Sequence, residues 1–457
     1  MSLPSAEYAI DDILRVRAGQ LWIEECDSVA LARQFGTPLY VISEHQLRRN
    51  VRAIREAFSR HWRPGKVQVL PSVKANYLLA LWRILADEGA GCDTFGAGEL
   101  YAALAARVPA KLISVNGSAK DSALIETAVR AGARITIDSA AELDLVMEVA
   151  ARLKKRATIR LRVRPDYDGL DEASDLVPDR SIKAAAQMYK PGIAPDVASR
   201  LGATAIEHPQ IDLSGLMVHL GRHSAQIAVW EKMAASFASL AARLSREWGG
   251  WRPRELDIGG GFATRRDPTS PARQPAPPID ALAEAIVRSL RDGLIRSGMD
   301  LSEVTLEVEP GRLLFADTGI HLATVRHIKV QQAPVQRQWV ETDTTEMFLP
   351  DLLIERARFM PIFASKASSA KSAVADLVGI SCGFDILAEH IPVPDLAAGD
   401  IIAFLDIGAY QDAASANFNA MPRPGTVLVS ADKAEWIKRP ETIADVFARD
   451  RVPERLA

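Results

Sequence analysis

Between residues 38 and 315 the chain alternates short apolar, β-branched runs with longer amphipathic segments. The segment after Ser43 has the clearest helical pattern, because Ser43 and Gln46 have the spacing of a capping box. Four apolar residues beyond this cap share one helical face: Leu47, Val51, Ile54 and Phe58. About eight strand–helix units follow one another in this way, and the succession predicts a parallel (β/α)8 barrel.

The strands expected in the barrel are the short apolar runs between the helical segments. They cover residues 38–42, 67–74, 110–117, 133–139, 157–165, 211–221, 254–262 and 304–312. Two further stretches, 164–187 and 264–278, are rich in turn-forming residues, and we expect them to be loops.

The pattern changes after the barrel, where apolar runs alternate with turns and little helical periodicity remains. This change indicates a second, mostly β domain, built as a β-barrel or β-sandwich. The expected organisation is an N-terminal segment over 1–36 that joins the β domain, a barrel over 37–315 and the C-terminal β domain over 316–457.

Composition and charge narrow the class of protein. The chain has 457 residues, of which 48% are hydrophobic and 25% charged, and its net charge is −3. These values are typical of a globular protein that is large enough for two domains. The basic residues are scattered among acidic ones and no apolar run has the length of a membrane span, so we expect neither a nucleic-acid partner nor a membrane anchor. The N-terminus lacks the apolar core of a signal peptide, and we expect a cytoplasmic protein.

The cysteines do not suggest a metal site or a disulfide framework. Cys26, Cys92 and Cys382 are odd in number and lack the spacing of metal ligands. We therefore expect reduced thiols and no metal ion.

Lys74 lies at the end of an apolar strand, and its position has two explanations. The long stem of a lysine can cover apolar surface while the ammonium reaches water. Alternatively, a lysine in a dry site has a lowered pKa, and its free amine can attack a carbonyl carbon. Lys74 alone does not decide between the two.

Other unusual residues fall where strands of the barrel end, which is where such barrels carry their chemistry. They are Asp93, Arg162, His219, Gly259, Gly260, Gly261, Glu309, Gly311 and Arg312. The glycines can form a tight turn and Asp93 can cap a helix. His219 can be a core histidine, and Glu309 can be the ion-pair partner of Arg312. Their convergence at one end of one barrel favours a shared site.

Together these residues suit a phosphate-bearing cofactor that carries an aldehyde. Glycine amides can approach a phosphate closely, and Lys74 offers an amine to the aldehyde. A carboxylate at Glu309 can keep a pyridine nitrogen protonated, and the flat ring of His219 can stack on the pyridine. The set indicates pyridoxal phosphate.

With these motifs in view, the chain resembles the group IV pyridoxal-phosphate decarboxylases of the alanine-racemase fold (fold type III), which act on diaminopimelate, ornithine or arginine. The resemblance covers nearly the whole chain and follows the order of the family. It is carried by SVKANY, GCDTFGAGEL, LRVRP, YKPGI, VHLG, DIGGGF, EVEPGR, VGISCGFDIL, GAYQDAASANFN and PRP.

The resemblance implies a role for each matched residue. Lys74 would bind the cofactor aldehyde, Glu309 would pair with the pyridine nitrogen, and His219 would stack on the ring. The remaining cofactor-binding positions would be Asp93, Arg162, Gly259, Gly260, Gly261, Gly311, Arg312 and Tyr410. Cys382 would enter the site from a partner subunit and return a proton after carbon dioxide leaves. The resemblance therefore also implies a homodimer with shared active sites, whereas a buried structural thiol is the alternative for Cys382.

The substrate side departs from the family. Arg222 stands where a small residue is usual, and it would reach the cofactor phosphate or the substrate unless it is a solvated surface arginine. Gly383 replaces the acid that normally follows the cysteine and contacts a distal amine, so either Asp385 shifts to replace it or the acid is absent. Leu349 and Leu353 stand where diaminopimelate enzymes carry an arginine and a tyrosine.

We therefore expect an amino-acid decarboxylase whose substrate is neither plain diaminopimelate nor ornithine. Candidate substrate-binding residues are Asp343, Asp351 and Asp385. Asp343 and Asp351 belong to a region that also contains Glu346, Glu355 and Arg358, any of which could contact the substrate side chain. The alternatives are an amino-acid racemase or epimerase, which needs a base on each face, a non-catalytic cofactor-binding protein, and an aldolase that uses Lys74 alone.

Overall fold

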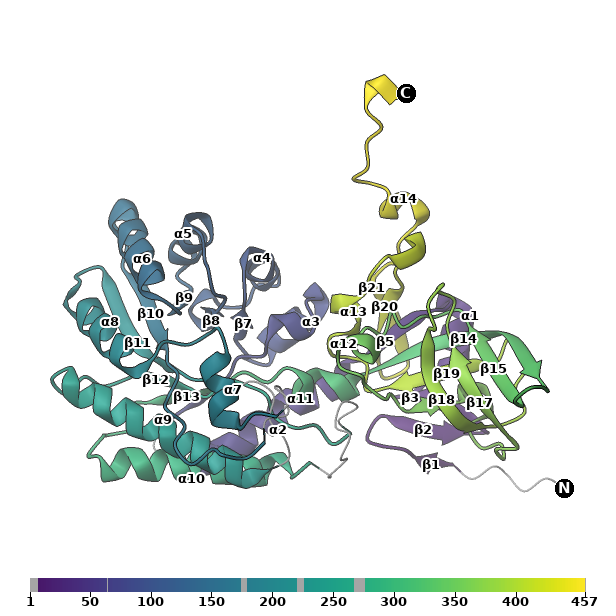
Figure 1. Ribbon diagram of the computed structural model, residues 1–457, viewed down its shortest axis with the longest axis horizontal. Coiled ribbons are helices and arrows are strands. Elements are labelled where there is room, and N and C mark those ends of the chain that lie inside the picture. Colours follow the sequence, from purple (N-terminus) through teal and green to yellow (C-terminus); the bar gives the residue numbers. More distant parts are fainter. Residues whose placement is uncertain (1–6, 64, 174–178, 220–225, 267–275, 457) are drawn as a thin grey trace. The chain divides into compact units, whose positions relative to one another are not determined.

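The computed structural model describes residues 7–63, 65–173, 179–219, 226–266 and 276–456 (Figure 1). The chain divides into two units. Unit 1 combines Met1–Leu47 with Phe315–Ala457, and unit 2 comprises Arg48–Asp267 and Gln274–Leu314.

Unit 2 is the parallel (β/α)8 barrel that the sequence predicts, with its helices outside the ring of strands (Figure 1). Its strands are β6 (Val67–Val69), β7 (Cys92–Thr94), β8 (Ile113–Val115), β9 (Arg134–Ile137), β10 (Ala157–Arg162), β11 (Ile211–Met217), β12 (Glu255–Asp257) and β13 (Thr305–Val308). They form one sheet in the order β6-β13-β12-β11-β10-β9-β8-β7. The ring closes between β6 and β7, where Gly91 N donates to Val69 O (2.9 Å) and Asp93 N donates to Pro71 O (3.0 Å).

The helices of the barrel follow the expected alternation. They are α2 (Glu44–His61), α3 (Leu79–Asp87), α4 (Ala97–Ala105), α5 (Ser122–Ala131), α6 (Ala140–Leu153), α7 (Ile182–Met188), α8 (Pro195–Glu207), α9 (Ile227–Glu247) and α10 (Ile279–Arg296). The start of α2 is as predicted, because Ser43 Oγ accepts a hydrogen bond from Gln46 N (3.0 Å). The expected loop over 164–187 is wrong in part because it contains α7, and most of the expected loop over 264–278 lies outside the described residues. No described helix combines the length and apolarity needed to cross a membrane.

Unit 1 is built mainly from β-strands. Its main sheet has the order β18-β17-β15-β14-β5-β20-β21, with β19 pairing β14 and β16. The strands are β5 (Leu39–Ser43), β14 (Gly319–Gln331), β15 (Arg337–Thr342), β16 (Pro361–Ile362), β17 (Ala373–Val378), β18 (Ile386–Val393), β19 (Ile401–Leu405), β20 (Gly425–Ser430) and β21 (Lys433–Lys438). A smaller sheet contains β1 (Tyr8–Ala9), β2 (Leu14–Arg17), β3 (Gln20–Ile23) and β4 (Cys26–Asp27), followed by α1 (Ser28–Phe35).

The strand expected over 38–42 is real, but its assignment to the barrel is wrong. It is β5, which pairs antiparallel with β14 and parallel with β20 in unit 1. All five of its residues are buried, so its apolar run cannot reveal which sheet it joins. The eighth barrel strand is instead the short β7.

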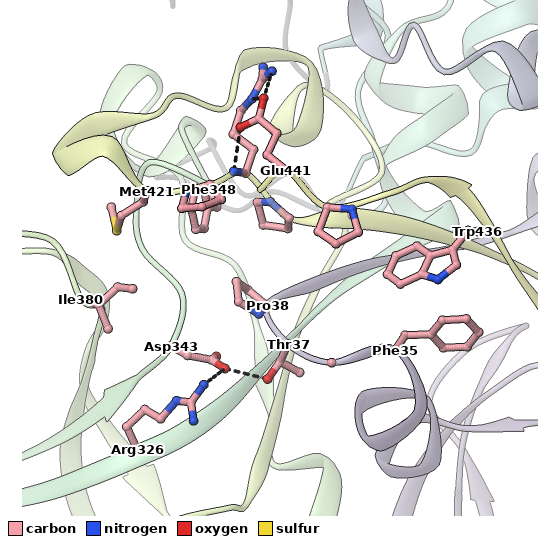
Figure 2. Close-up of a pocket in the computed structure, with 16 residues that line it drawn as sticks. Phe35, Thr37, Pro38, Arg326, Asp343, Phe348, Ile380, Met421, Trp436 and Glu441 are labelled. Atoms are coloured by element: carbon pink, nitrogen blue, oxygen red, sulfur yellow. Dashed lines mark hydrogen bonds and ion pairs between the residues drawn. The ribbon is translucent and has the colours of Figure 1, made fainter. Parts of the chain in front are cut away.

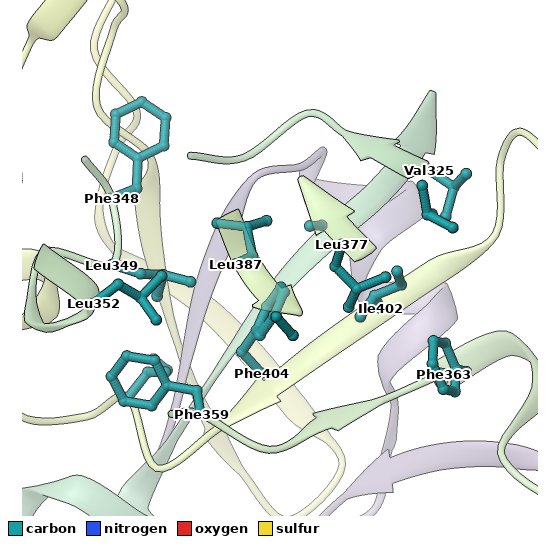
Figure 3. Close-up of a cluster of buried hydrophobic side chains, with 14 of the residues drawn as sticks. Val325, Phe348, Leu349, Leu352, Phe359, Phe363, Leu377, Leu387, Ile402 and Phe404 are labelled. Atoms are coloured by element: carbon teal, nitrogen blue, oxygen red, sulfur yellow. The ribbon is translucent and has the colours of Figure 1, made fainter. Parts of the chain in front are cut away.

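A large apolar cluster fills unit 1 beside these strands (Figure 3). Phe404 of β19 and Leu377 of β17 are fully buried in it. Leu349, one of the two leucines at the expected substrate side, is also fully buried in this cluster, whereas Leu353 is 48% exposed. Leu349 is therefore a core residue of unit 1.

We expect Leu349→Ala to lower the free energy of unfolding by about 2–5 kcal/mol, because the truncation leaves a cavity in a closely packed core. Leu353→Ala, the matched control in the exposed turn of α12 (Asp351–Ile354), should change it by less than about 0.5 kcal/mol. Urea unfolding of both variants measures the difference. Equal effects would contradict the core assignment.

Candidate active site

The first element of the site is Lys74, which lies in the 3₁₀ turn Val73–Ala75 just after β6. Closure of the barrel places it beside Asp93 of β7, with Nζ 3.5 Å from Asp93 Oδ2. Ser72 Oγ also donates to Asp93 Oδ2 (2.8 Å). The Lys74 side chain is 50% exposed, so a ligand can contact its amine. Asp93 is buried, and its carboxylate is fixed by hydrogen bonds from its neighbours.

Asn116 links Asp93 to Glu309 across the barrel. Its Nδ2 donates to Asp93 Oδ1 (2.6 Å) and to Glu309 Oε1 (2.5 Å). The sequence analysis brought Lys74, Asp93 and Glu309 together correctly but missed Asn116. A signal was available, because Asn116 directly follows β8 and so belongs to the same end of the barrel.

A buried arginine, Arg160 of β10, forms the second missed part of the site. Its side chain is fully buried, and its Nη atoms contact Asp257 Oδ2 (2.5 Å), Glu307 Oε2 (2.5 Å) and Glu309 Oε1 (3.0 Å). The sequence offered a signal here too, because Arg160 lies two residues before Arg162 and Glu307 two before Glu309. Residues two apart on a strand face the same side, so these charges follow the expected site residues into the barrel interior.

The buried carboxylates have altered proton affinities. Burial raises the pKa of Glu309 well above its usual range, and the charges of Asp257 and Asp93 raise it further, against the lowering effect of Arg160. Burial also raises the pKa of Glu307 to about 7, against Arg134 and Arg160. Both carboxyl groups therefore bind a proton more tightly than an exposed glutamate does.

His219 and the glycine triplet form a close-packed corner beside Glu309. Gly260 N donates to His219 Nδ1 (3.1 Å), which sets the orientation of the imidazole. A Cβ atom on Gly259 would lie 2.5 Å from His219 Nδ1, and one on Gly260 would lie 2.1 Å from Glu309 O. Gly259 and Gly261 also have φ angles of +72° and +91°, which favour glycine. Only glycine fits at Gly259 and Gly260, so no Cβ atom covers the turn, although Gly259 N donates to Asp257 Oδ1 (2.7 Å) and Gly260 N to His219 Nδ1.

These residues fit pyridoxal phosphate by their chemistry. They offer a reachable amine, a buried carboxylate in negative surroundings, an oriented imidazole and a bare glycine backbone next to one another in unit 2. Arg162 is 9% exposed at the end of β10, and Arg312 begins the short helix α11 (Arg312–Phe315) just after Gly311. Arg222 lies outside the described residues.

Cys382 lies in an exposed loop of unit 1 and is held there by Asn419. Cys382 N donates to Asn419 Oδ1 (3.1 Å), and Asn419 Nδ2 lies 3.4 Å from Cys382 Sγ. Cys382 is exposed, which contradicts the alternative of a buried structural thiol.

Asp385 anchors the Cys382 loop. Its carboxylate is 1% exposed and accepts hydrogen bonds from Ser381 N (2.6 Å), Glu346 N (2.7 Å) and Thr345 Oγ1 (3.0 Å). These bonds commit Asp385 to the structure of its own loop, which weighs against a shift toward substrate.

Asp343 and Asp351 are likewise buried and bonded within unit 1. Asp343 accepts from Thr37 Oγ1 (2.6 Å) and Arg326 Nη2 (3.1 Å) on the wall of a cavity of about 350 Å³ (Figure 2). Asp351 accepts from Gln411 Nε2 (2.8 Å). Tyr410 lies just before the short helix α13 (Gln411–Ala414) with a φ of +69°.

We expect Asp385→Ala to loosen the Cys382 loop, because two backbone amides and one hydroxyl lose a buried acceptor at a cost of about 1–3 kcal/mol. Hydrogen exchange at Ser381 and Glu346 should become faster, and alkylation of Cys382 should change in rate. Phe384→Ala is the matched control, since Phe384 lies in the same loop but is 93% exposed. Unchanged protection of both amides would contradict the anchoring role.

Comparison with known proteins identifies the family. The sequence profile described as "Pyridoxal-dependent decarboxylase, pyridoxal binding domain" matches residues 44–316. The diaminopimelate decarboxylase of Methanocaldococcus jannaschii is 30% identical over 458 residues, which cover 98% of each chain. That of Pseudomonas aeruginosa is 31% identical over 441 residues, covering 96% of this chain and 98% of the relative.

Solved structures of decarboxylases also resemble this chain. The crystal structure of the M. jannaschii diaminopimelate decarboxylase in complex with L-lysine has a TM-score of 0.89 and 29% identity, covering 98% of this chain and 100% of that one. The lysine/ornithine decarboxylase of Vibrio vulnificus has a TM-score of 0.70 at 23% identity over 88% of this chain and 97% of that one, and it supports the fold alone. These relatives are all decarboxylases, and none favours a racemase or a non-catalytic protein. The chain therefore belongs to the pyridoxal-dependent decarboxylases, and it is a carboxy-lyase that removes the carboxyl group of an amino acid with pyridoxal phosphate as its cofactor.

Proposed function

We propose that the linked side chains of Lys74, Asp93, Asn116 and Glu309 form the cofactor-binding half of the active site. The observation that carries this proposal is Asn116, which hydrogen-bonds both Asp93 and Glu309 and so holds the lysine partner and the buried carboxylate in one rigid unit. His219 would lie against the pyridine ring, and the glycine turn Gly259–Gly261 would lie around the phosphate with Gly311 and Arg312. Arg162, Tyr410 and Arg222 complete the proposed set.

The chain's own residues would act in a fixed order. Lys74 would hold the cofactor through its amine, and Asp93, which lies 3.5 Å from Lys74 Nζ, would keep that amine in place. Bound pyridoxal phosphate supplies an electron sink for the electron pair left at the α-carbon when carbon dioxide departs. Glu309 would pair with the ring nitrogen from its buried position. Cys382 then returns a proton to the α-carbon, either from Sγ or through a water that the thiol positions.

We propose that Cys382 acts in the site of a partner subunit, which makes the protein a homodimer with shared active sites. The thiol is exposed on the surface of unit 1, and large apolar side chains surround it in sequence and structure. Ile380, Phe384 and Phe418 are 51%, 93% and 46% exposed. Such a group of exposed apolar residues favours burial against another protein surface.

The substrate we propose is an amino acid other than plain diaminopimelate or ornithine. The family acid after the cysteine is replaced by Gly383, and Leu349 offers only a buried apolar side chain. A Cβ atom on Gly383 would lie 3.3 Å from Glu346 Oε1, so the Glu346 carboxylate occupies space beside the replaced acid. Partial burial and the charge of Asp385 raise the pKa of Glu346, which favours an incoming donor or cation. We assign Glu346, rather than Asp343, Asp351 or Asp385, to the distal end of the substrate.

The domain roles and the location remain predictions from the sequence. The sequence predicts a barrel over 37–315 and a β domain over 1–36 and 316–457, but residues 37–47 and Phe315 belong to unit 1. We propose that the barrel of unit 2 binds the cofactor, that unit 1 is the β domain, and that the enzyme is cytoplasmic.

Mass spectrometry in heavy water with pooled L- and D-amino acids and cell extracts tests the reaction and finds the substrate. We expect one compound to lose its carboxyl group and gain one deuterium at the α-carbon. Glu346→Gln should raise KM for that compound about tenfold or more, because a charge-assisted hydrogen bond is lost. Glu389→Gln, whose side chain is 63% exposed in β18, is the matched control. Deuterium gained with the carboxyl group retained would contradict decarboxylation, and an unchanged KM would contradict the role of Glu346.

Mixing two inactive variants tests the shared site. Lys74→Ala and Cys382→Ala should each abolish or strongly reduce turnover of the substrate found above. After the two variants exchange subunits, hybrid dimers contain one site with both residues intact, and about a quarter of the wild-type activity should return. Activity that stays at the level of the separate variants would contradict a site shared between subunits.

A further inference from the structure

The barrel interior contains more buried negative than positive charge. Among the described residues, Arg160 contacts Asp257, Glu307 and Glu309, and Arg134 contacts Glu307 and Glu255. Two guanidinium groups thus face four carboxylates, all of them buried or nearly so. Unbalanced charge in a dry interior is costly, so protons or an incoming cation must offset the excess.

Glu309 is the member of this group that can meet an incoming cation. It directly follows β13, at the end of the barrel that carries Lys74, whereas Glu307 lies inside the strand. Its Oε1 accepts from Arg160 Nη2 and from Asn116 Nδ2. The charge of Glu309 therefore depends on Arg160 more directly than on any other described cation.

Arg160 and Arg134 differ in whether they contact Glu309. Arg160 reaches Glu309 at 3.0 Å, and its Nε donates to Thr136 Oγ1 (2.8 Å), which fixes the plane of the guanidinium. Arg134 belongs to the same buried group and contacts Glu307 at 2.8 Å, but it makes no described contact with Glu309. Loss of either residue removes one buried positive charge, and only loss of Arg160 removes a direct partner of Glu309.

We propose that Arg160 is a positioning residue that lowers the proton affinity of Glu309, so that the proton shared between Glu309 and a bound cofactor would lie on the ring nitrogen. The inference rests on the proposed function, in which Glu309 faces that nitrogen. A cation bonded to one carboxylate oxygen lowers the proton affinity of the carboxylate more than that of a base on its far side. Without Arg160, the surplus of neighbouring carboxylates leaves the proton on Glu309, and the ring becomes a weaker electron sink.

The ¹⁵N resonance of pyridoxal phosphate labelled at the ring nitrogen, bound to the full-length protein, reports where the proton lies. In the wild-type protein we expect the resonance of a protonated ring at neutral pH. Arg160→Gln should move it toward that of an unprotonated ring, and Arg160→Lys should restore part of the shift. Arg134→Gln is the matched control and should leave the resonance near the wild-type position.

Two further variants keep the test decisive if Arg160→Gln does not fold. The double variant Arg160→Gln/Glu307→Gln removes one charge of each sign and so leaves the buried imbalance unchanged. It should still shift the resonance, because Glu309 has lost its direct partner. Glu309→Gln provides the reference for a ring nitrogen without a carboxylate.

The outcomes separate this inference from the proposed function. If Glu309→Gln leaves the resonance unchanged, Glu309 does not face the ring nitrogen and its proposed role fails. If Glu309→Gln shifts the resonance but the Arg160 variants do not, the role of Glu309 stands and that of Arg160 is overturned. An equal shift in the Arg134 and Arg160 variants would also overturn it, because buried charge alone would then explain the effect.

Discussion

Closure of the barrel between β6 and β7 is the constraint on which the site depends. The amides of Gly91 and Asp93 bond to the carbonyl groups of Val69, at the end of β6, and Pro71, and this pairing brings Asp93 to within 3.5 Å of the Lys74 amine. The other strands of the ring are each held by hydrogen bonds to their two neighbouring strands. An open sheet with the same strands would leave Lys74 and Asp93 at opposite edges.

The closed ring also creates a dry interior, and the chain fills it with charge as well as with apolar side chains. Arg160 is fully buried and has three carboxylate neighbours, while Asn116 joins Glu309 to Asp93. Such a network is costly unless each member finds a partner, so it restricts the rotamers of the residues that we propose to bind the cofactor. The stability of the barrel and the electrostatics of the site therefore depend on the same contacts.

In unit 1 an apolar core, and not a charged network, supports the loop that carries Cys382. An apolar cluster around Phe404 and Leu349 holds its strands, and the exposed Cys382 loop is attached to this frame by the buried carboxylate of Asp385. The hydrogen bonds of Asp385 hold the base of the loop, and the tip residues Gly383 and Phe384 take no part in these bonds. The tip can therefore differ in sequence from that of relatives. If this loop contacts the substrate, as we propose, its tip can change in sequence without disturbing the motifs of the barrel.

The sequence by itself determined the barrel and the cofactor and brought Lys74, Asp93 and Glu309 to one end of the barrel, because strand ends and ordered motifs are local features of the chain. Residues 38–42 were assigned to the wrong sheet because a strand buried on both faces has the same apolar pattern in either sheet. Asn116 and Arg160 gained their importance only in the folded barrel, where strands distant in sequence bring Glu309 within hydrogen-bonding distance. The commitments of Asp343, Asp351 and Asp385 to internal hydrogen bonds were also decided by tertiary structure, since a carboxylate's partners depend on which chain segments pack around it.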